Sequence, residues 1–514
     1  MTMISPKEHP SQDHIERVSS TATGVEKLDK IDTVHQDEAL KVLLNYDGDS
    51  TWSPDEEAKL VRKIDRRLLV ILVLTFAIQF HDKFLFSHAA IFGMRTDLEL
   101  TVGNRFSMAS SIFYLGYIVG AYPATFLAQK FPIHIVVFTM VFLWGTCVLA
   151  GGWCNSFREL YVQRFFLGLL ESGVSPVWMM VVGGWYTKVE QTFRMGVWFA
   201  AAPMMAIPAP LINFGLGHIK GSLSPWRYMF IFAGCITIVW AFVILFCMDP
   251  DPITARRLSD REKFIAVSRL RVNNSGVRNT HFKREQVFEA LGSPLFWLLF
   301  FMSATVNTVN AVTSTFTPLI INVSMGYTGL KSLLLTMPTG AVGVIVTLAL
   351  SWVATVFSRY NLRIWSYTFS SSILLLSCIL IWNVPQMANG SKLVCLYLLA
   401  FHPAAYAVLM NLSIANVAGY TKRSTVSAGL FVGYCVGNFA GPLTFLQSES
   451  PRYTTGWTFI TACLASTILM GMLYRFLCQS ANKSREAAGV DESFDNAYVD
   501  DMTDVSNLHF RYIY

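Results

Sequence analysis

The apolar residues of this chain fall in long, nearly uninterrupted blocks, and this feature restricts the fold more than any other. From Leu68 to Leu477 about twelve blocks occur, each near the roughly 20 residues that an α-helix needs to cross a bilayer core. Only 14% of the residues are charged, whereas soluble domains usually carry about 25%. A membrane β-barrel would instead show alternating segments of about ten residues, which the sequence lacks. The blocks predict an all-α membrane protein with twelve transmembrane helices.

The spans divide into two sets of six. We place them at residues 68–93, 105–127, 132–153, 160–184, 194–217, 227–247, 294–321, 330–355, 363–382, 392–417, 425–446 and 455–477. The motif "WYTKVEQTFRMG" follows the fourth span and "GYTKRSTVSAG" follows the tenth. Either the halves are duplicated or basic short loops resemble each other by chance. Duplication would give two pseudo-symmetric six-helix bundles, the repeat pattern of one large transporter architecture.

The predicted domains follow from these spans. An N-terminal six-helix bundle occupies residues 65–247 and a C-terminal six-helix bundle occupies residues 293–478, with a polar cytoplasmic loop at 248–292 between them. Residues 1–64 and the acidic residues 479–514 are expected to be disordered tails, because they are too polar to bury a core. Prolines inside the fifth, eighth, tenth and eleventh spans suit helices that bend, and these are Pro203, Pro208, Pro210, Pro338, Pro403 and Pro442.

Basic residues indicate the orientation. They gather before the first span and in the loops after the fourth and tenth spans, as Arg62, Lys63, Arg66, Arg67, Lys188, Arg194, Lys422 and Arg423 show. The loop after the sixth span, residues 248–292, adds nine Lys or Arg. The positive-inside rule then places both termini in the cytoplasm. We expect a monomer in the bilayer of the plasma membrane. The net charge of +6 reflects this asymmetry and indicates no nucleic-acid partner, and the nine scattered Cys indicate neither a disulfide framework nor a metal or other cofactor.

Charged residues inside two spans carry the functional prediction. Asp82 lies fourteen residues beyond Leu68, or about 21 Å at 1.5 Å per residue, well inside a core about 30 Å thick. Asp or Lys near the centre of a span costs about 2.5–3.5 kcal/mol, so Asp82 and Lys83 must face partners or water rather than lipid. In the fourth span Arg164 and Glu171 are seven residues apart and share one face of the helix.

Two interpretations of these charges remain open. A buried ion pair could lock the first and fourth spans together, or the acids could take up protons during transport. The spans of the second half contain neutral polar residues instead, namely Asn307, Asn310, Asn411, Asn416, Asn438 and His402. Collecting the charges in one half suits a proton-coupled carrier, because protonating an acid changes which arrangement of the bundles is stable.

Several stretches together resemble the major facilitator superfamily, and within it the fungal allantoate permease group of anion:cation symporters. The resemblance runs from about Arg62 to Arg475. It is carried by "FHDKFLFSHAAIFG", "RFFLGLLESGVSP", "WYTKVEQTFRMGVWF", "SPWRYMFIFAG", "DPDPITARRLSDREK" and "NVAGYTKRS". It implies proton-driven uptake of a small organic anion, such as a ureide, a vitamin, a peptide or a sulfur-containing acid, by alternating access.

The resemblance also implies roles for single residues. The acids that match the family pattern, Asp82 and Glu171, would titrate, and Lys83 and Arg164 would attract the substrate. Tyr114 would line the cavity. His81 either hydrogen-bonds to Asp82 and tunes it or joins the proton route itself. We expect the neutral Asn310 and Asn438 of the second half to complete the substrate site.

The sequence bears on three other functions. A primary pump would need a nucleotide site, but no GxxxxGK[ST] motif occurs. A membrane-embedded enzyme could use His81 and His88, which lie seven residues apart, although no third ligand accompanies them. A nutrient sensor that does not transport could be built on the same fold.

Overall fold

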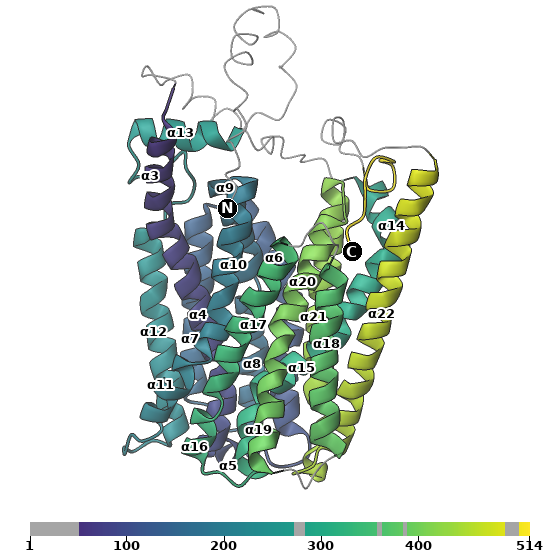
Figure 1. The fold of residues 1–514 in the computed structure, drawn as a ribbon. Coiled ribbons are helices and arrows are strands. Elements are labelled where there is room, and N and C mark those ends of the chain that lie inside the picture. The colour runs from purple at the N-terminus through teal and green to yellow at the C-terminus, as the bar shows by residue number, and fades with distance from the viewer. Residues whose placement is uncertain (1–50, 272–282, 357–361, 384–387, 489–502) are drawn as a thin grey trace, which may run out of the picture.

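The computed structural model describes residues 51–271, 283–356, 362–383, 388–488 and 503–514. Within these residues, twelve helices are long and apolar enough to cross a membrane. Figure 1 shows them as two bundles side by side, the first in purple to teal and the second in green to yellow. The predicted helical fold with six spans in each half is therefore confirmed.

The N-terminal bundle contains six spans, of which the first, fourth and fifth are built from more than one helical segment. Its elements are α3 (Pro54–Ile64), η2 (Asp65–Leu69), α4 (Val70–Ala89), η3 (Ala90–Met94), α5 (Arg95–Asp97), α6 (Arg105–Lys130), α7 (Ile133–Gly151), α8 (Phe157–Glu171), α9 (Val174–Trp185), α10 (Lys188–Met205), α11 (Pro208–Leu216) and α12 (Pro225–Cys247).

The C-terminal bundle follows two short helices of the central segment. Those helices are α13 (Asp260–Arg271) and α14 (Arg284–Gly292). The elements of the bundle are α15 (Pro294–Val323), α16 (Gly329–Leu334), α17 (Met337–Val356), α18 (Arg363–Asn383), α19 (Asn389–Leu398), η5 (Leu399–Phe401), α20 (His402–Ala415), α21 (Tyr420–Leu443), η6 (Gln447–Glu449) and α22 (Thr454–Ala487).

The two halves repeat the same helix pairing. In the first half the first span packs on the fifth (α4 on α10), the second on the fourth (α6 on α8) and the third on the sixth (α7 on α12). The second half pairs α15 with α21, α17 with α20 and α18 with α22. These are the corresponding spans, which is the relation expected of parallel repeats.

Prolines interrupt several spans. The fifth span breaks between α10 and α11 just before Pro208, the eighth between α16 and α17 just before Pro338, and the tenth at η5 before Pro403. A proline in a helix removes one backbone donor and clashes with the preceding turn, which accounts for these breaks. By contrast, α21 continues through Pro442 to Leu443.

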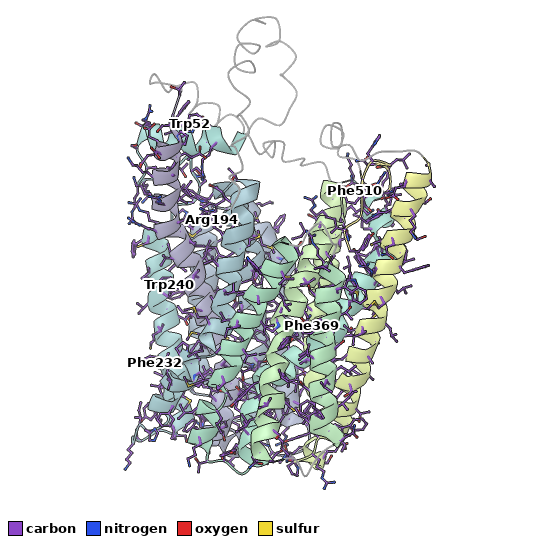
Figure 2. The ribbon with its side chains drawn as sticks, viewed as in Figure 1. Trp52, Arg194, Phe232, Trp240, Phe369 and Phe510 are labelled. Atoms are coloured by element: carbon purple, nitrogen blue, oxygen red, sulfur yellow. The ribbon has the colours of Figure 1, made fainter. Side chains whose placement is uncertain are left out.

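Large apolar side chains on the outside of both bundles are exposed. Phe246, Leu469 and Ile345 have 72%, 71% and 66% of their surface exposed. Phe232 and Phe369, labelled in Figure 2, are also exposed, one on each bundle. In water such a surface would aggregate, whereas in a bilayer it contacts lipid tails. The protein is a multi-pass membrane protein.

The bundles are joined by hydrogen bonds at one end. We call the end with α3, α13 and the C-terminal residues 503–514 the terminal end (Figure 1). Between described residues, five hydrogen bonds join the bundles, and all lie in the half away from it: Arg95 to Gln447, Asn104 to Leu443, Ser107 to Phe445, Ser110 to Thr315 and Ser111 to Phe439. In Figure 1 the ribbons of the bundles diverge toward the terminal end.

In the part of the chain that the structure describes, ion pairs at the terminal end stay within one half of the molecule. On the side of the N-terminal bundle, Arg194, labelled in Figure 2, pairs with Asp65 at 2.7 Å, and Arg269 of α13 pairs with Glu190 at 3.1 Å. On the other side Lys422 pairs with Glu289 at 2.8 Å. Within the described residues, these ion pairs connect segments on the same side of the molecule, and none of them joins the two bundles.

The prediction of disordered tails is wrong for three described segments. Residues 54–64 form the helix α3, because Ser53 and Glu56 make a capping box and Pro54 begins the helix. The last span continues as α22 to Ala487. Residues 1–50 and 489–502 lie outside the described part.

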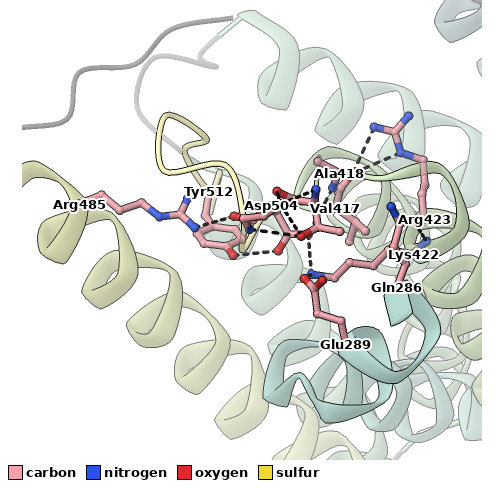
Figure 3. A network of polar contacts seen from close by, with 11 residues as sticks. Gln286, Glu289, Val417, Ala418, Lys422, Arg423, Arg485, Asp504 and Tyr512 are labelled. Carbon is pink, nitrogen blue, oxygen red and sulfur yellow. Dashed lines mark hydrogen bonds and ion pairs between the residues drawn. The ribbon is translucent and has the colours of Figure 1, made fainter. Parts of the chain in front are cut away.

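The third segment, residues 503–514, packs against the terminal end of the C-terminal bundle (Figure 3). Asp504 lies 2.7 Å from the amine of Lys422 and accepts a hydrogen bond from Tyr512. The amide of Asn416 bonds to both the N–H and the C=O of Ile513, and the amide of Asn482 does the same with Tyr512. The acidic composition by itself predicts disorder here. It misses the packing because the partners that hold this segment come from distant parts of the chain.

Candidate functional site

Lys83 of α4 and Glu171 of α8 form an ion pair on the side of the N-terminal bundle that faces the C-terminal bundle. The Nζ of Lys83 lies 3.5 Å from Oε1 of Glu171, which is too long for a strong hydrogen bond. The Glu171 side chain is 1% exposed and that of Lys83 is 14% exposed. Three aromatic rings also surround the amine, with centroids 4.7 Å (Phe80), 5.9 Å (Phe113) and 5.4 Å (Tyr117) away. The cation is therefore held by one carboxylate and by ring faces.

The backbone explains why Glu171 occupies this position. It is the last residue of α8, and Pro176 in the first turn of α9 has no N–H to bond to the carbonyl of Ser172. The fourth span is therefore broken directly after the acid, a break that we did not predict. Close contact of α8 with α6 fixes the depth, because Gly168 lies directly against the carbonyl of Phe113.

Arg164 lies two turns before Glu171 on α8. Its Nε donates to the carbonyl of Ala109 on α6 at 3.3 Å. Its guanidinium carbon lies 4.4 Å from the ring centroid of Phe86 and 5.2 Å from that of Phe113. Within the described residues its two Nη atoms make no hydrogen bond, although the residue is only 6% exposed. The guanidinium is thus held in place through Nε, and within the described residues its two Nη groups, which could bind a carboxylate, donate no hydrogen bond.

Asp82 points in a different direction from Lys83. Its Oδ1 lies 3.4 Å from Nδ1 of His81, and the carboxyl faces Trp144 of α7 and Thr237 of α12. The Asp82 side chain is 1% exposed. Adjacent residues on a helix are about 100° apart, so Asp82 turns into the N-terminal bundle while Lys83 turns toward Glu171. The structure brings Asp82 together with His81, as one of our two interpretations of the histidine requires.

Residues of the C-terminal bundle face the charged cluster across the boundary between the bundles. The ring of Tyr114 on α6 lies edge-on to that of Tyr434 on α21, with centroids 6.2 Å apart. Asn310 donates to Asn438 at 2.8 Å and lies 3.5 Å from the Tyr434 hydroxyl. Deeper in this bundle the ring of His402 bonds to Asn307 at 3.1 Å. Asn310 and Asn438 thus belong to one polar group, as a shared substrate site requires.

Two residues of the site were missed in the sequence. Gln79 is fully buried one turn before Lys83, and Tyr434 stands one turn before Asn438. Gln79 precedes Lys83 by four residues, and Tyr434 precedes Asn438 by four. Residues at this spacing share one face of a helix, which is the sequence signal that could have identified them. Gln79 escaped notice because a neutral amide is less conspicuous than a charge, and Tyr434 because tyrosine is common in apolar helices.

The cluster contains buried polar atoms without hydrogen-bond partners in the described part of the chain. They are both amide atoms of Gln79, both carboxyl oxygens of Glu171, Oδ2 of Asp82 and Nε2 of His81. Such atoms are uncommon in native proteins, and each of them needs an explanation. No group of three or more metal-ligating side chains occurs among the described residues. His88 bonds instead to Asn213 at 2.8 Å.

Comparison with known proteins agrees with this picture. The family described as the Major Facilitator Superfamily matches residues 67–442. An uncharacterized transporter of Schizosaccharomyces pombe is 34% identical over 93% of this chain and 90% of its own length. The allantoate permease of Saccharomyces cerevisiae is 31% identical over 93% of this chain and 90% of its own length. A bacterial homologue of the human lysosomal transporter Spinster, crystallised in an inward-facing and unoccupied conformation, shares the fold with a TM-score of 0.62. The two sequences are 15% identical, and the match covers 80% of this chain and 95% of that one.

Two repeated bundles with a buried charged cluster at their boundary, together with relatives that are transporters, define a membrane transporter. The family match covers well over half of the chain. This chain belongs to the Major Facilitator Superfamily, in the family of fungal transporters that includes allantoate permease. Because these relatives are transporters and not enzymes, the alternative of a membrane-embedded enzyme falls away.

Proposed function

We propose that this protein is a proton-coupled symporter that imports a small organic anion, a carboxylate or a sulfonate. The observation that carries the proposal is the buried Lys83–Glu171 pair, in which one proton can release one cation. An acid kept away from water is most stable either paired with a cation or neutral. Proton uptake by Glu171 therefore frees Lys83 for a new anionic partner.

The substrate site is proposed at the boundary between the bundles. Lys83 and the unused Nη atoms of Arg164 would bind the anionic group, because a guanidinium fork and an amine together suit a planar carboxylate. Tyr114 and Tyr434 would enclose the organic part, and Asn310 and Asn438 would supply neutral hydrogen bonds from the other bundle. A ligand that contacts both bundles can link its own binding to their relative movement.

Asp82 and His81 are proposed as a second proton site behind the first. Their contact of 3.4 Å is buried and has no direct partner in the C-terminal bundle within the described residues. Protons reaching Asp82 would change the charge next to Glu171 without meeting the substrate. Loss of Asp82 would accordingly affect coupling more than substrate binding.

Orientation and membrane complete the proposal. Basic residues at the terminal end would place both termini in the cytoplasm. We further propose that the protein works as a monomer in the plasma membrane. The interbundle hydrogen bonds would then lie on the outer side, and the structure would be open to the inside. Alternating access would break these hydrogen bonds and bring the terminal ends of the bundles together.

Uptake into proteoliposomes under an imposed pH gradient tests the proposal. Radiolabelled allantoate is the first probe, because a relative carries its name, followed by vitamin carboxylates, dipeptides and sulfonates as competitors. We expect accumulation that requires an acidic exterior and is lost in Glu171→Gln, while exchange of labelled for unlabelled substrate continues. Uptake that does not respond to the gradient would contradict proton coupling. Binding without any uptake would identify a sensor.

A further inference from the structure

Gln79 on α4 has two buried polar atoms that the charged cluster leaves without a partner. The residue is 0% exposed, and neither its Nε2 nor its Oε1 has a hydrogen bond within the described residues. Buried side-chain amides are nearly always hydrogen-bonded, so this exception calls for an explanation. The two carboxyl oxygens of Glu171 are likewise without a hydrogen bond.

The geometry places these unpaired groups beside each other. Gln79 lies one helical turn before Lys83, so both side chains leave α4 on the same face. Lys83 reaches to 3.5 Å from the Glu171 carboxyl, and the buried Gln79 lies one turn away on the same face of α4. One helix thus presents Glu171 with a cation and a neutral amide side by side.

The two partners suit different protonation states of Glu171. An ammonium group only donates hydrogen bonds and attracts a carboxylate, whereas an amide has both a donor and an acceptor. A protonated carboxyl has an O–H that needs an acceptor and a C=O that accepts a donor. Gln79 can meet both needs at once through Oε1 and Nε2, which Lys83 cannot do.

We propose that Gln79 is a positioning residue that binds the Glu171 carboxyl after a proton has neutralised it, and so keeps Lys83 free for the anionic substrate. This inference rests on the proposed function. Other titratable or charged groups also face Glu171, and they are Asp82 on α4, Arg164 on α8, Tyr117 on α6, Cys147 on α7 and Tyr434 on α21. Unlike these groups, Gln79 does not titrate, and its planar amide combines a hydrogen-bond donor with an acceptor.

Infrared difference spectroscopy of the full chain in lipid nanodiscs tests this role directly and needs no known substrate. Titration from alkaline to acidic pH should produce the C=O stretching band of protonated Glu171, assigned by its loss in Glu171→Gln. A hydrogen bond to the C=O lowers this frequency, so Gln79→Leu should move the band to higher frequency. The matched control is Gln163→Leu, which removes a buried amide whose Nε2 bonds to the carbonyl of Cys147 at 3.0 Å, and should leave the band in place.

The outcomes separate this inference from the proposed function. A Glu171 band that stays unchanged in Gln79→Leu, or that moves equally in Gln163→Leu, overturns the role of Gln79 and leaves proton coupling intact. A chain without any Glu171 carboxyl band at acidic pH overturns both. If Gln79→Leu does not fold, Gln79→Asn, whose amide is one methylene shorter, should produce the same upward shift, and an unchanged band in that variant is equally decisive.

Discussion

Ser107 of α6 donates a hydrogen bond of 2.9 Å to the carbonyl of Phe445, just beyond the end of α21 in the other bundle. Asn104, immediately before α6, similarly donates to Leu443, the last residue of α21. The last carbonyls of a helix have no partner inside it, so the first bundle completes the end of a helix of the second. This connection must break whenever the bundles separate at that end.

Removing these interbundle hydrogen bonds should favour the alternate state of the transporter. We expect Ser107→Ala combined with Ser111→Ala to shift the equilibrium by about 1–3 kcal/mol, since each hydrogen bond contributes about 0.5–1.5 kcal/mol. Distances between spin labels on the two bundles measure the populations. Ser377→Ala, which removes a hydrogen bond within α18, is the control and should leave the distances unchanged.

Replacing one partner of the Lys83–Glu171 pair should destabilise the protein more than replacing both. A buried charge that loses its partner destabilises a protein by about 3–5 kcal/mol, whereas replacing both partners is often nearly neutral. Lys83→Met should therefore lower the unfolding temperature of the detergent-purified protein, and Lys83→Met with Glu171→Gln should restore much of it. A double variant as unstable as the single one would show that the two residues do not depend on each other.

Arg164→Ala should raise the KM for the transported anion with little change in maximal rate. A hydrogen bond to a charged group contributes about 1.5–3 kcal/mol, which corresponds to a rise of roughly tenfold or more. Concentration-dependent uptake measures this split, and Arg164→Lys should recover only part of the affinity because an amine lacks the planar fork. An unchanged KM would argue that Arg164 only braces α6 through the carbonyl of Ala109.

Gly168→Ala should separate α8 from α6 and displace Glu171. The added Cβ would overlap the carbonyl oxygen of Phe113, which is backbone and cannot turn away. We expect both the unfolding temperature and the transport rate to fall. Gly184→Ala on α9 is a matched control, because no atom lies within 4 Å of the added Cβ there. Equal behaviour of the two variants would contradict the proposed role of this contact.

Asp504→Asn should loosen the C-terminal segment. Lys422 is buried with only 2% of its side chain exposed and pairs with both Asp504 and Glu289, so it would keep one carboxylate of two. We expect a lower unfolding temperature and faster proteolysis of residues 503–514. Asp260→Asn, at a side chain that is 94% exposed, should change neither. Protection of the segment in the Asp504 variant would mean that its contacts with Asn416, Asn482 and Arg485 are enough to hold it.

Much of the fold is readable from the sequence because a bilayer acts on each segment separately. Every backbone polar group in lipid must be bonded within its own helix, so hydrophobic length alone marks the twelve spans. The same reasoning selected Lys83, Arg164 and Glu171, since charges in a span need partners. The break after Glu171 has a signal in the sequence, Pro176, which we did not include among the prolines that suit bent spans. The packing of residues 503–514 did not follow from the sequence, because it depends on contacts between distant segments.

Hydrophobic length and intramembrane charge, both properties of the sequence alone, thus determined that this chain has twelve spans with its intramembrane charges in the first half. Only the tertiary structure decided that Lys83 pairs with Glu171 while Asp82 turns to His81, and that Gln79 and Tyr434 join the site. The physical reason is that a partner depends on the rotation and depth of each helix. These are set by backbone contacts such as Gly168 on Phe113, which link positions 55 residues apart.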